Sequence, residues 1–170
     1  MSTIRTLLAQ PISREAFAPF GELVSAGVVA GASANQGTAT RFDHAARLES
    51  DRVQSRPNLA VFRAQPQDLP FVVKLLEHHP HSSQAFIPMV CKRFLVIVAP
   101  TAADGGPSTG QLAAFVCGPG QGVNYHAGVW HHPIVAIDGP ADFAMLAWED
   151  GTAGDCVERQ VQMPVLVRVG

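Results

Sequence analysis

Short hydrophobic runs separated by turn-forming residues are the dominant pattern along this chain. Its 15 glycines and 13 prolines recur between runs rich in Val, Phe, Ile and Leu, which predicts β-strands joined by turns. The predicted strands are residues 59–63, 71–79, 85–89, 93–98, 112–117, 123–126, 134–137, 143–148 and 161–169. Many short strands without intervening helices favour an all-β sandwich or barrel of the jelly-roll kind.

Residues 71–76 allow a second interpretation, because Asp68 can cap a helix there and the apolar residues are nearly continuous. We prefer a strand, since alternate residues from Phe71 to His79 then share one face. Residues 104–107, Asp-Gly-Gly-Pro, predict a hairpin-like reversal between two apolar runs.

Helix signals are few near the N-terminus. Ser13 can cap a short turn, which Pro19 and Gly21 end almost at once. The glycine-rich residues 27–40 predict a loop, and the mixed-charge residues 41–56 predict a solvated connection. We therefore expect a single domain over residues 1–170, with residues 1–56 as a short N-terminal extension of strands, helical turn and loop.

The composition excludes several classes of protein. With 47% hydrophobic residues, 15% charged residues and a net charge of −2, the chain is too apolar for disorder and too neutral for nucleic-acid binding. Its apolar runs are shorter than the roughly 20 residues of a membrane span, and no signal-peptide stretch begins it, so we expect a cytoplasmic protein. Three thinly spread cysteines predict reduced thiols.

Histidine is the most informative residue type. Six of the seven histidines fall in two stretches, namely His78, His79 and His81, then His126, His131 and His132. Clustered imidazoles indicate a metal site or a proton-transfer site. Strand alternation places Glu77 and His79 on one face and His78 on the other, whereas Pro80 leaves the direction of His81 open.

Both stretches resemble sequence motifs of the cupin superfamily. In the second, Gly128 and His131 match the spacing from a glycine turn to a metal-binding histidine, and His126 stands where proline is usual. In the first, His79 and His81 stand for the two motif histidines. Gln84 stands near the place of the motif glutamate, so a neutral amide replaces an anionic ligand.

Four segments carry a narrower resemblance, to the ureidoglycolate lyase family: residues 35–42, 77–89, 94–100 and 125–133. The resemblance implies a cupin-type double-stranded β-helix, that is, a jelly-roll barrel. It also implies a homodimer that splits (S)-ureidoglycolate into glyoxylate and urea during allantoin breakdown in purine and nitrogen metabolism. A divalent metal, nickel in some descriptions, is the implied cofactor, and neither nucleic acid nor membrane is an expected partner.

Cleavage of ureidoglycolate needs a base, an acid and an anion clamp. We expect His131 or His126 to take the hydroxyl proton near neutral pH. Glu77 can do so if burial raises its pKa or if it accepts the proton without a shift. If a metal binds, His79, Gln84 and His131 are the expected ligands.

The substrate carboxylate requires a cation, and Arg41 is the basic residue of the glycine-rich segment that resembles the family. Asn35, Thr38 and Ser83 are candidates for recognising the urea amides, although such residues in loops also satisfy local turns. For His78 and His132 a structural role is the better interpretation. For His126, Glu77 and Gln84, structural and functional roles are both open.

Two other functions are compatible with the same residues. One is a different metal-dependent cupin enzyme, such as a dioxygenase or isomerase. The other is a barrel that binds a small carboxylate without catalysis.

Overall fold

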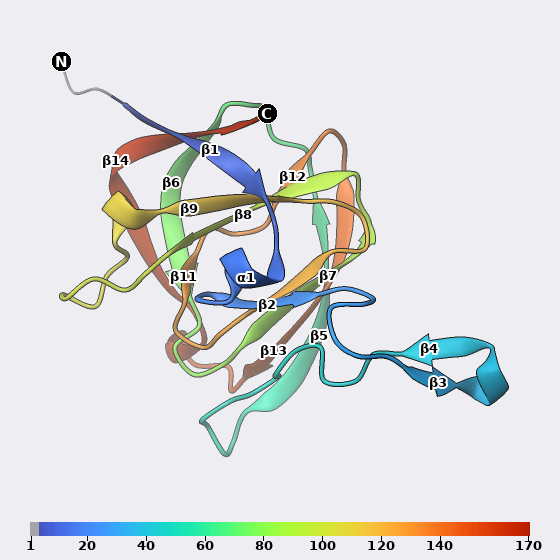
Figure 1. Cartoon of the computed structure of the whole chain (residues 1–170). Coiled ribbons are helices and arrows are strands. Elements are labelled where there is room, and N and C mark those ends of the chain that lie inside the picture. The colour runs from blue at the N-terminus through green and yellow to red at the C-terminus, as the bar shows by residue number, and fades with distance from the viewer. Residues whose placement is uncertain (1–3) are drawn as a thin grey trace.

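The computed structural model describes residues 4–170, and its main elements are two β-sheets that face each other (Figure 1). The larger sheet contains, in spatial order, β11 (Trp130–His131), β6 (Phe71–His78), β14 (Val157–Val169), β1 (Arg5–Pro11), β9 (Ala113–Cys117), β8 (Arg93–Ala99) and β12 (Val135–Ile137). β11 pairs with both β6 and β8, which closes this sheet on itself. The all-β jelly-roll barrel expected from the sequence is confirmed.

The second sheet has five strands. Their spatial order is β2 (Gly21–Val24), β10 (Gly122–Tyr125), β7 (Gln84–Val90), β13 (Ala141–Glu149) and β5 (Arg56–Ala64). β5 lies at the edge of this sheet, next to β13.

Helical structure is confined to single turns. They are α1 (Arg14–Phe17), η1 (Asn35–Gly37), η2 (Thr109–Gln111) and η3 (Ala153–Asp155). Ser13 caps α1 as expected, because its Oγ accepts a hydrogen bond from the Ala16 amide at 3.1 Å. No helix within residues 4–170 has the length and hydrophobicity needed to cross a membrane.

All nine predicted strands are present, with ends displaced by up to four residues. Residues 71–78 form a strand and not the alternative helix, and the reversal at residues 104–107 lies between β8 and β9. The prediction of a loop over residues 27–40 is partly wrong. β3 (Ala32–Ala34) and β4 (Ala39–Arg41) pair with each other across η1 and project from the barrel (Figure 1). We call residues 32–41 the arm.

The first two strands belong to the barrel itself. β1 runs parallel to both β14 and β9, and β2 pairs with β10. From the sequence we expected strands within residues 1–56 but gave no bounds for them, because their pairing partners lie far away in the chain. Of residues 4–56, residues 25–55 form the extension. They include the arm and connect β2 to β5.

The core lies on both faces of β8. Phe94, Val96 and Val98 pack into one hydrophobic cluster, and the alternate residues Leu95 and Ile97 pack into another. Because both faces of this strand are covered, its sequence is an uninterrupted apolar run. β8 also holds β11 in place, and β11 carries one of the site histidines.

Candidate active site

Glu77, His79 and His131 form a compact cluster at one end of the barrel. Their nearest nitrogen and oxygen ligand atoms all lie within 4.8 Å of one another. Glu77 and His131 are direct partners in the antiparallel pairing of β6 with β11. Strand alternation brings His79 to the same face as Glu77, as the sequence predicted. The structure thus unites the two histidine stretches.

His79 presents a free nitrogen to the cluster. Its Nδ1 lies 2.7 Å from the backbone carbonyl oxygen of Asp155, and because a carbonyl only accepts, Nδ1 carries the hydrogen. Nε2 then bears a lone pair, and it is buried without a hydrogen-bond partner. Burial and the nearby His131 lower the pKa of His79, which favours the neutral ring. An uncharged imidazole held in this tautomer is a ready metal ligand.

His131 is almost fully buried and is held on three sides. Its Nδ1 lies 2.9 Å from the carbonyl oxygen of Val129, and its Nε2 lies 3.0 Å from Oε1 of Gln84. The ring of Tyr125 stacks on the imidazole with a centroid separation of 4.0 Å and an interplanar angle of 7°. These contacts direct Nε2 toward Glu77, whose Oε1 lies at 3.5 Å.

Glu77 connects the buried histidines to the solvent side. Its Oε2 accepts a hydrogen bond from the thiol of Cys156, an exposed residue, at a sulfur–oxygen distance of 3.7 Å. Burial acts to raise the pKa of Glu77, but the hydrogen bond and charge of His131 outweigh it, so this pKa is lowered. Glu77 is therefore a carboxylate at neutral pH. Burial and the charge of Glu77 raise the pKa of Cys156 to about 12, so Cys156 remains a thiol.

Two imidazoles and one carboxylate are a donor set suited to a divalent transition metal. His131 would have to release the Nε2 proton that faces Gln84 and Glu77 to serve as a ligand. The unpartnered Nε2 of His79 supports this fit, because a buried lone pair without a partner is costly. From the sequence we expected His79, Gln84 and His131 as ligands. In the structure Glu77 supplies the carboxylate of the triad, while Gln84 contacts His131.

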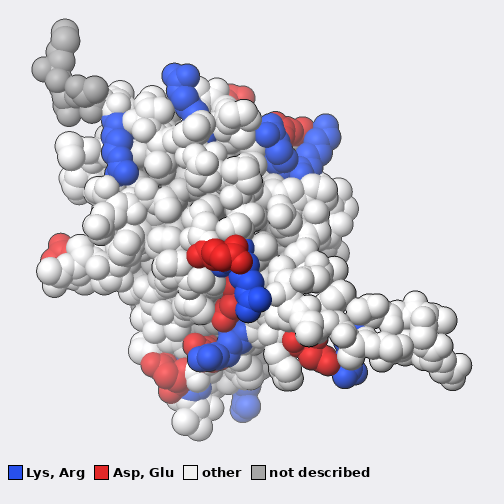
Figure 2. Space-filling model, viewed as in Figure 1, with Lys and Arg blue, Asp and Glu red and all other residues white. Residues whose placement is uncertain are grey.

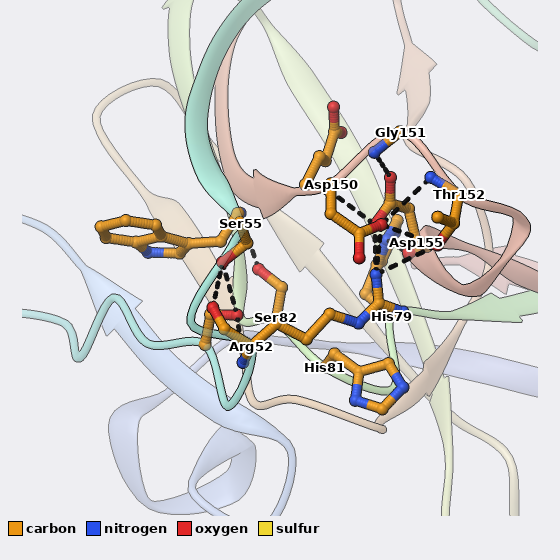
Figure 3. A network of polar contacts seen from close by, with 12 residues as sticks. Arg52, Ser55, His79, His81, Ser82, Asp150, Gly151, Thr152 and Asp155 are labelled. Atoms are coloured by element: carbon orange, nitrogen blue, oxygen red, sulfur yellow. Dashed lines mark hydrogen bonds and ion pairs between the residues drawn. The ribbon is translucent and has the colours of Figure 1, made fainter.

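A polar network lies behind His79 (Figure 3). The Arg52 guanidinium sits between two carboxylates, at 2.6 Å from Asp150 and 2.9 Å from Asp155, and its side chain is only 13% exposed. The Thr152 hydroxyl and amide, together with Arg52, lower the pKa of Asp150 to about 2. Because the Asp155 carbonyl also binds His79, this network links the loop after β13 to the cluster.

The structure does not bring every predicted site residue to the cluster. His126 lies beside Glu22, with 3.7 Å between Nδ1 and Oε2, in a separate surface pocket that His44 also lines. Its strand neighbour Tyr125 faces the cluster, and adjacent strand residues point to opposite faces. Ser83 is buried, and its Oγ accepts a hydrogen bond from the Glu49 amide at 3.0 Å. The Ser83 hydroxyl is therefore engaged in a contact within the chain.

The three predicted binding residues of the glycine-rich segment lie on the arm, away from the barrel that carries the cluster (Figure 1). The side chain of Arg41 is 70% exposed and pairs with Asp43 at 3.0 Å. Thr38 donates from Oγ1 to the carbonyl oxygen of Asn35 at 2.8 Å, which is a local turn contact. Arg41 therefore does not lie beside the histidines of its own chain, because its segment pairs with itself and projects from the barrel.

The remaining histidines of the two stretches have other contacts. His78 stacks on Trp130 at 3.9 Å, and His132 packs edge-on against Phe71 at 5.0 Å, so both lie outside the cluster as expected. His81 pairs with Asp51 at 2.9 Å. Sequence reasoning missed three residues at the site: Tyr125, Asp155 and Cys156. Only Tyr125 had a signal, since it shares a face with the apolar Val123 in the predicted strand.

Comparison with known proteins adds independent findings. The family model described as ureidoglycolate lyase matches residues 4–168. The ureidoglycolate lyases of Pseudomonas fluorescens strains Pf-5 and SBW25 are each 39% identical to this chain over 155 residues, which is 91% of this chain and 91% of each relative. The ureidoglycolate lyase of Pseudomonas putida strain W619 matches to the same extent.

Two solved structures resemble the chain at low sequence identity. A dTDP sugar isomerase from Desulfovibrio desulfuricans G20 is 18% identical with a TM-score of 0.47, over 83% of this chain and 87% of that one. A 3,4-ketoisomerase from Helicobacter canadensis is 13% identical with a TM-score of 0.44, over 80% of this chain and 88% of that one.

Proposed function

This chain belongs to the ureidoglycolate lyase family, and from that premise we propose that its Glu77–His79–His131 cluster cleaves ureidoglycolate to glyoxylate and urea. The observation that carries the proposal is an ionised, partly buried carboxylate held against two buried imidazoles. Ureidoglycolate bears a hydroxyl, a carboxylate and a ureido nitrogen on one carbon, so its cleavage moves a single proton.

Glu77 is the proton carrier. Its Oε2, on the side of Cys156, accepts the hydroxyl proton of the substrate. The oxygen electrons then form the carbonyl of glyoxylate as the carbon–nitrogen bond breaks, and the departing nitrogen takes the proton from Glu77. No water is consumed. From the sequence we expected a raised or unshifted pKa for this role, whereas the pKa of Glu77 is lowered by His131. Glu77 is thus ionised before the reaction and, as a weak base, returns the proton readily to the nitrogen.

The two histidines hold Glu77 and the substrate in place. His131 lies 3.5 Å from Oε1 of Glu77, and Gln84 and Tyr125 fix the orientation of its ring. His79 directs its Nε2 into the same space. If a divalent metal is bound by Glu77, His79 and His131, it supplies Lewis acidity that lowers the pKa of the substrate hydroxyl. Nickel is the metal that we propose to test first.

We further propose that the enzyme acts as a homodimer in allantoin breakdown, in the cytoplasm. The free cysteines Cys91, Cys117 and Cys156 are compatible with a reducing compartment. Exposed apolar residues on the outer face of the five-stranded sheet are compatible with a subunit contact.

The direct test is to incubate the purified protein with racemic ureidoglycolate and to quantify glyoxylate, urea and ammonia. Equal amounts of glyoxylate and urea without ammonia are expected, with half of the racemate consumed if one enantiomer is used. Release of ammonia would indicate hydrolysis at the ureido carbonyl instead. Binding without turnover would indicate a carboxylate-binding barrel.

Metal content is measured on the same sample. Elemental analysis of the protein before and after chelation, followed by nickel titration in a calorimeter, reports binding independently of activity. Glu77→Gln and His79→Ala should each weaken nickel binding. Stoichiometric iron with oxygen-dependent turnover would favour another class of cupin enzyme.

A further inference from the structure

The arm lacks a hydrophobic core of its own. Its paired residues are small: Ala32, Ser33, Ala34, Ala39 and Thr40. A lone two-stranded hairpin is marginally stable in water, and these strands have only three residues each. The tip adds strain, because Asn35 and Gln36 adopt φ values of 51° and 58° in the left-handed region. Contacts from outside the arm are therefore needed to hold its shape.

An exposed apolar surface lies on the outer face of the five-stranded sheet. We call Leu59, Val61, Ile87 and Val90 the strip. Leu59, Val61 and Val90 are 65–70% exposed. In the strand register Ala144 lies between Val61 and Ile87, which places these two side chains on one face. Asp142 lies between Arg63 and Val90 on the same face, so an Arg63–Asp142 ion pair adjoins the strip. Contiguous apolar side chains at this level of exposure mark a contact with another protein.

The strands of the strip lead to a loop of the candidate active site. β13 ends at Glu149 and leads into the loop of Asp150 and Asp155, which contacts His79. Asn58 on β5 donates a hydrogen bond to Glu149 at 2.9 Å. A second copy packed on the strip would thus lie next to this loop. The arm leaves the barrel near β2 and β5 (Figure 1).

A guanidinium beside the cluster would bind the carboxylate of an anionic substrate. Arg52 lies beside the cluster, but Asp150 and Asp155 already neutralise it. Arg41 is the exposed cation of the arm, and Figure 2 shows that the arm is otherwise a mainly uncharged projection. Among residues 4–170 its ion-pair partner is the half-exposed Asp43, so exchanging that contact for a substrate carboxylate costs little.

We propose that two copies of this chain pack strip against strip and that each arm reaches across to the other copy's cluster. The substrate lies in the cluster of one copy. Arg41 of the other copy binds its carboxylate, and Asn35 at the tip of the same arm contacts its ureido group. A two-fold axis makes the contact reciprocal, so each site is completed by the other subunit. This inference rests on the proposed lyase activity, since it assigns the carboxylate clamp of that reaction.

The test is complementation between two inactive variants. Arg41→Ala removes the arm cation and His131→Ala removes a cluster imidazole, and each variant alone should lose at least 90% of the wild-type turnover at low substrate concentration. The two chains are co-expressed with different affinity tags, and the mixed dimers are isolated through both tags. One site of each mixed dimer combines an intact cluster with an intact arm, so we expect half of the wild-type specific activity.

Mixed dimers no more active than their parents would show that Arg41 acts within its own chain and would overturn the proposal. Full activity of Arg41→Ala would overturn it as well. If the wild-type protein itself produces no glyoxylate, the proposed lyase function fails. If the wild-type protein is active but the mixed dimers are not, only the proposal about the arm fails.

The interface is tested by light scattering coupled to gel filtration. The wild-type protein should be a dimer, and Val61→Lys should be a folded monomer with reduced turnover. Val53→Lys is the matched control, because Val53 is fully exposed but lies on a loop outside the strip, and this variant should remain dimeric. A monomeric wild-type protein, or a dimeric Val61→Lys variant, would contradict the strip-to-strip contact.

Discussion

His79 and His131 each bind a backbone carbonyl through Nδ1, that of Asp155 and that of Val129 respectively. Both rings are thereby fixed in orientation, and both Nε2 atoms lie near the carboxylate of Glu77. Both acceptors are main-chain carbonyl oxygens, so the side-chain types at positions 129 and 155 could not predict these hydrogen bonds. The orientation of both rings therefore depends on the backbone conformation at Val129 and Asp155.

The adjacent histidines His131 and His132 are expected to differ in their effect on turnover. His131→Ala should lower kcat by about 100-fold or more, because it removes the group that orients the carboxylate of Glu77. His132→Ala is the matched control, since that ring packs on Phe71 on the opposite face, and its kcat should stay near the wild-type value. Steady-state glyoxylate formation below the melting temperature of both variants checks this. Equal turnover in wild type and His131→Ala would refute the role.

At the scale of elements, β2 and β10 pack so closely that a side chain cannot fit between them. A Cβ atom added at Gly21 would lie 2.0 Å from the backbone oxygen of Asn124. Asn124 and Gly21 belong to the pairing that ends at Tyr125, the residue that stacks on His131. A displacement of β2 is therefore expected to disturb the base of the site.

Gly21→Ala should lower the free energy of unfolding by about 1–3 kcal/mol, because backbone atoms have to move. Gly110→Ala is the control, since an added Cβ there meets no atom within 4 Å, and its stability should change by less than about 0.5 kcal/mol. Urea denaturation followed by circular dichroism measures both. Equal stability of the two variants would contradict the close packing of β2 on β10.

The loops at the rim of the barrel are connected by Arg52, which joins the segment before β5 to the loop after β13. Arg52→Ala leaves two carboxylates close together without their cation. We expect a melting temperature about 5 °C lower, since 1 kcal/mol corresponds to about 2–4 °C in a chain of this size. Weaker nickel binding should accompany it, because the Asp155 carbonyl positions His79.

Arg93→Ala is the comparison for Arg52→Ala, because Arg93 also pairs with a carboxylate, that of Asp138, but at the surface. Its melting temperature should change little, since exposed ion pairs contribute little to stability. A larger loss in Arg93→Ala than in Arg52→Ala, measured by differential scanning fluorimetry, would show that the Arg52 network is not a main support of the rim.

At the scale of the whole molecule, buried histidines make stability depend on pH. Burial is the main cause of the lowered pKa of His78, His79 and His132, relative to an ordinary value of 6.5. Protons therefore bind the unfolded chain more readily than the folded one. The contribution of these groups is complete above pH 6.5 and is lost as the pH falls through their folded pKa values.

We expect the melting temperature to fall when the pH is lowered from 7.5 to 5.5, and His132→Ala to reduce the size of that fall. Thermal denaturation of the chelated protein in buffers of constant ionic strength provides the measurement. A melting temperature that rises or stays constant over this interval would contradict the prediction.

Local pattern alone determined nine of the strands, the common face of Glu77 and His79, and the exclusion of His78 from that face. These features follow from backbone geometry that repeats every two residues, so they require no knowledge of distant segments. The two motif stretches and their resemblance to a lyase family were likewise visible in the order of residues.

Only the tertiary structure decided which segments meet. The pairing of β6 with β11 placed Glu77 beside His131, where Gln84 also contacts the ring, and the fold placed His126 beside Glu22 in a surface pocket. Arg41 lies away from the Glu77–His79–His131 cluster of its own chain because the two strands of the arm pair with each other. Contacts between residues far apart in the chain depend on sheet order and loop closure, and these are set by the packing of the whole barrel.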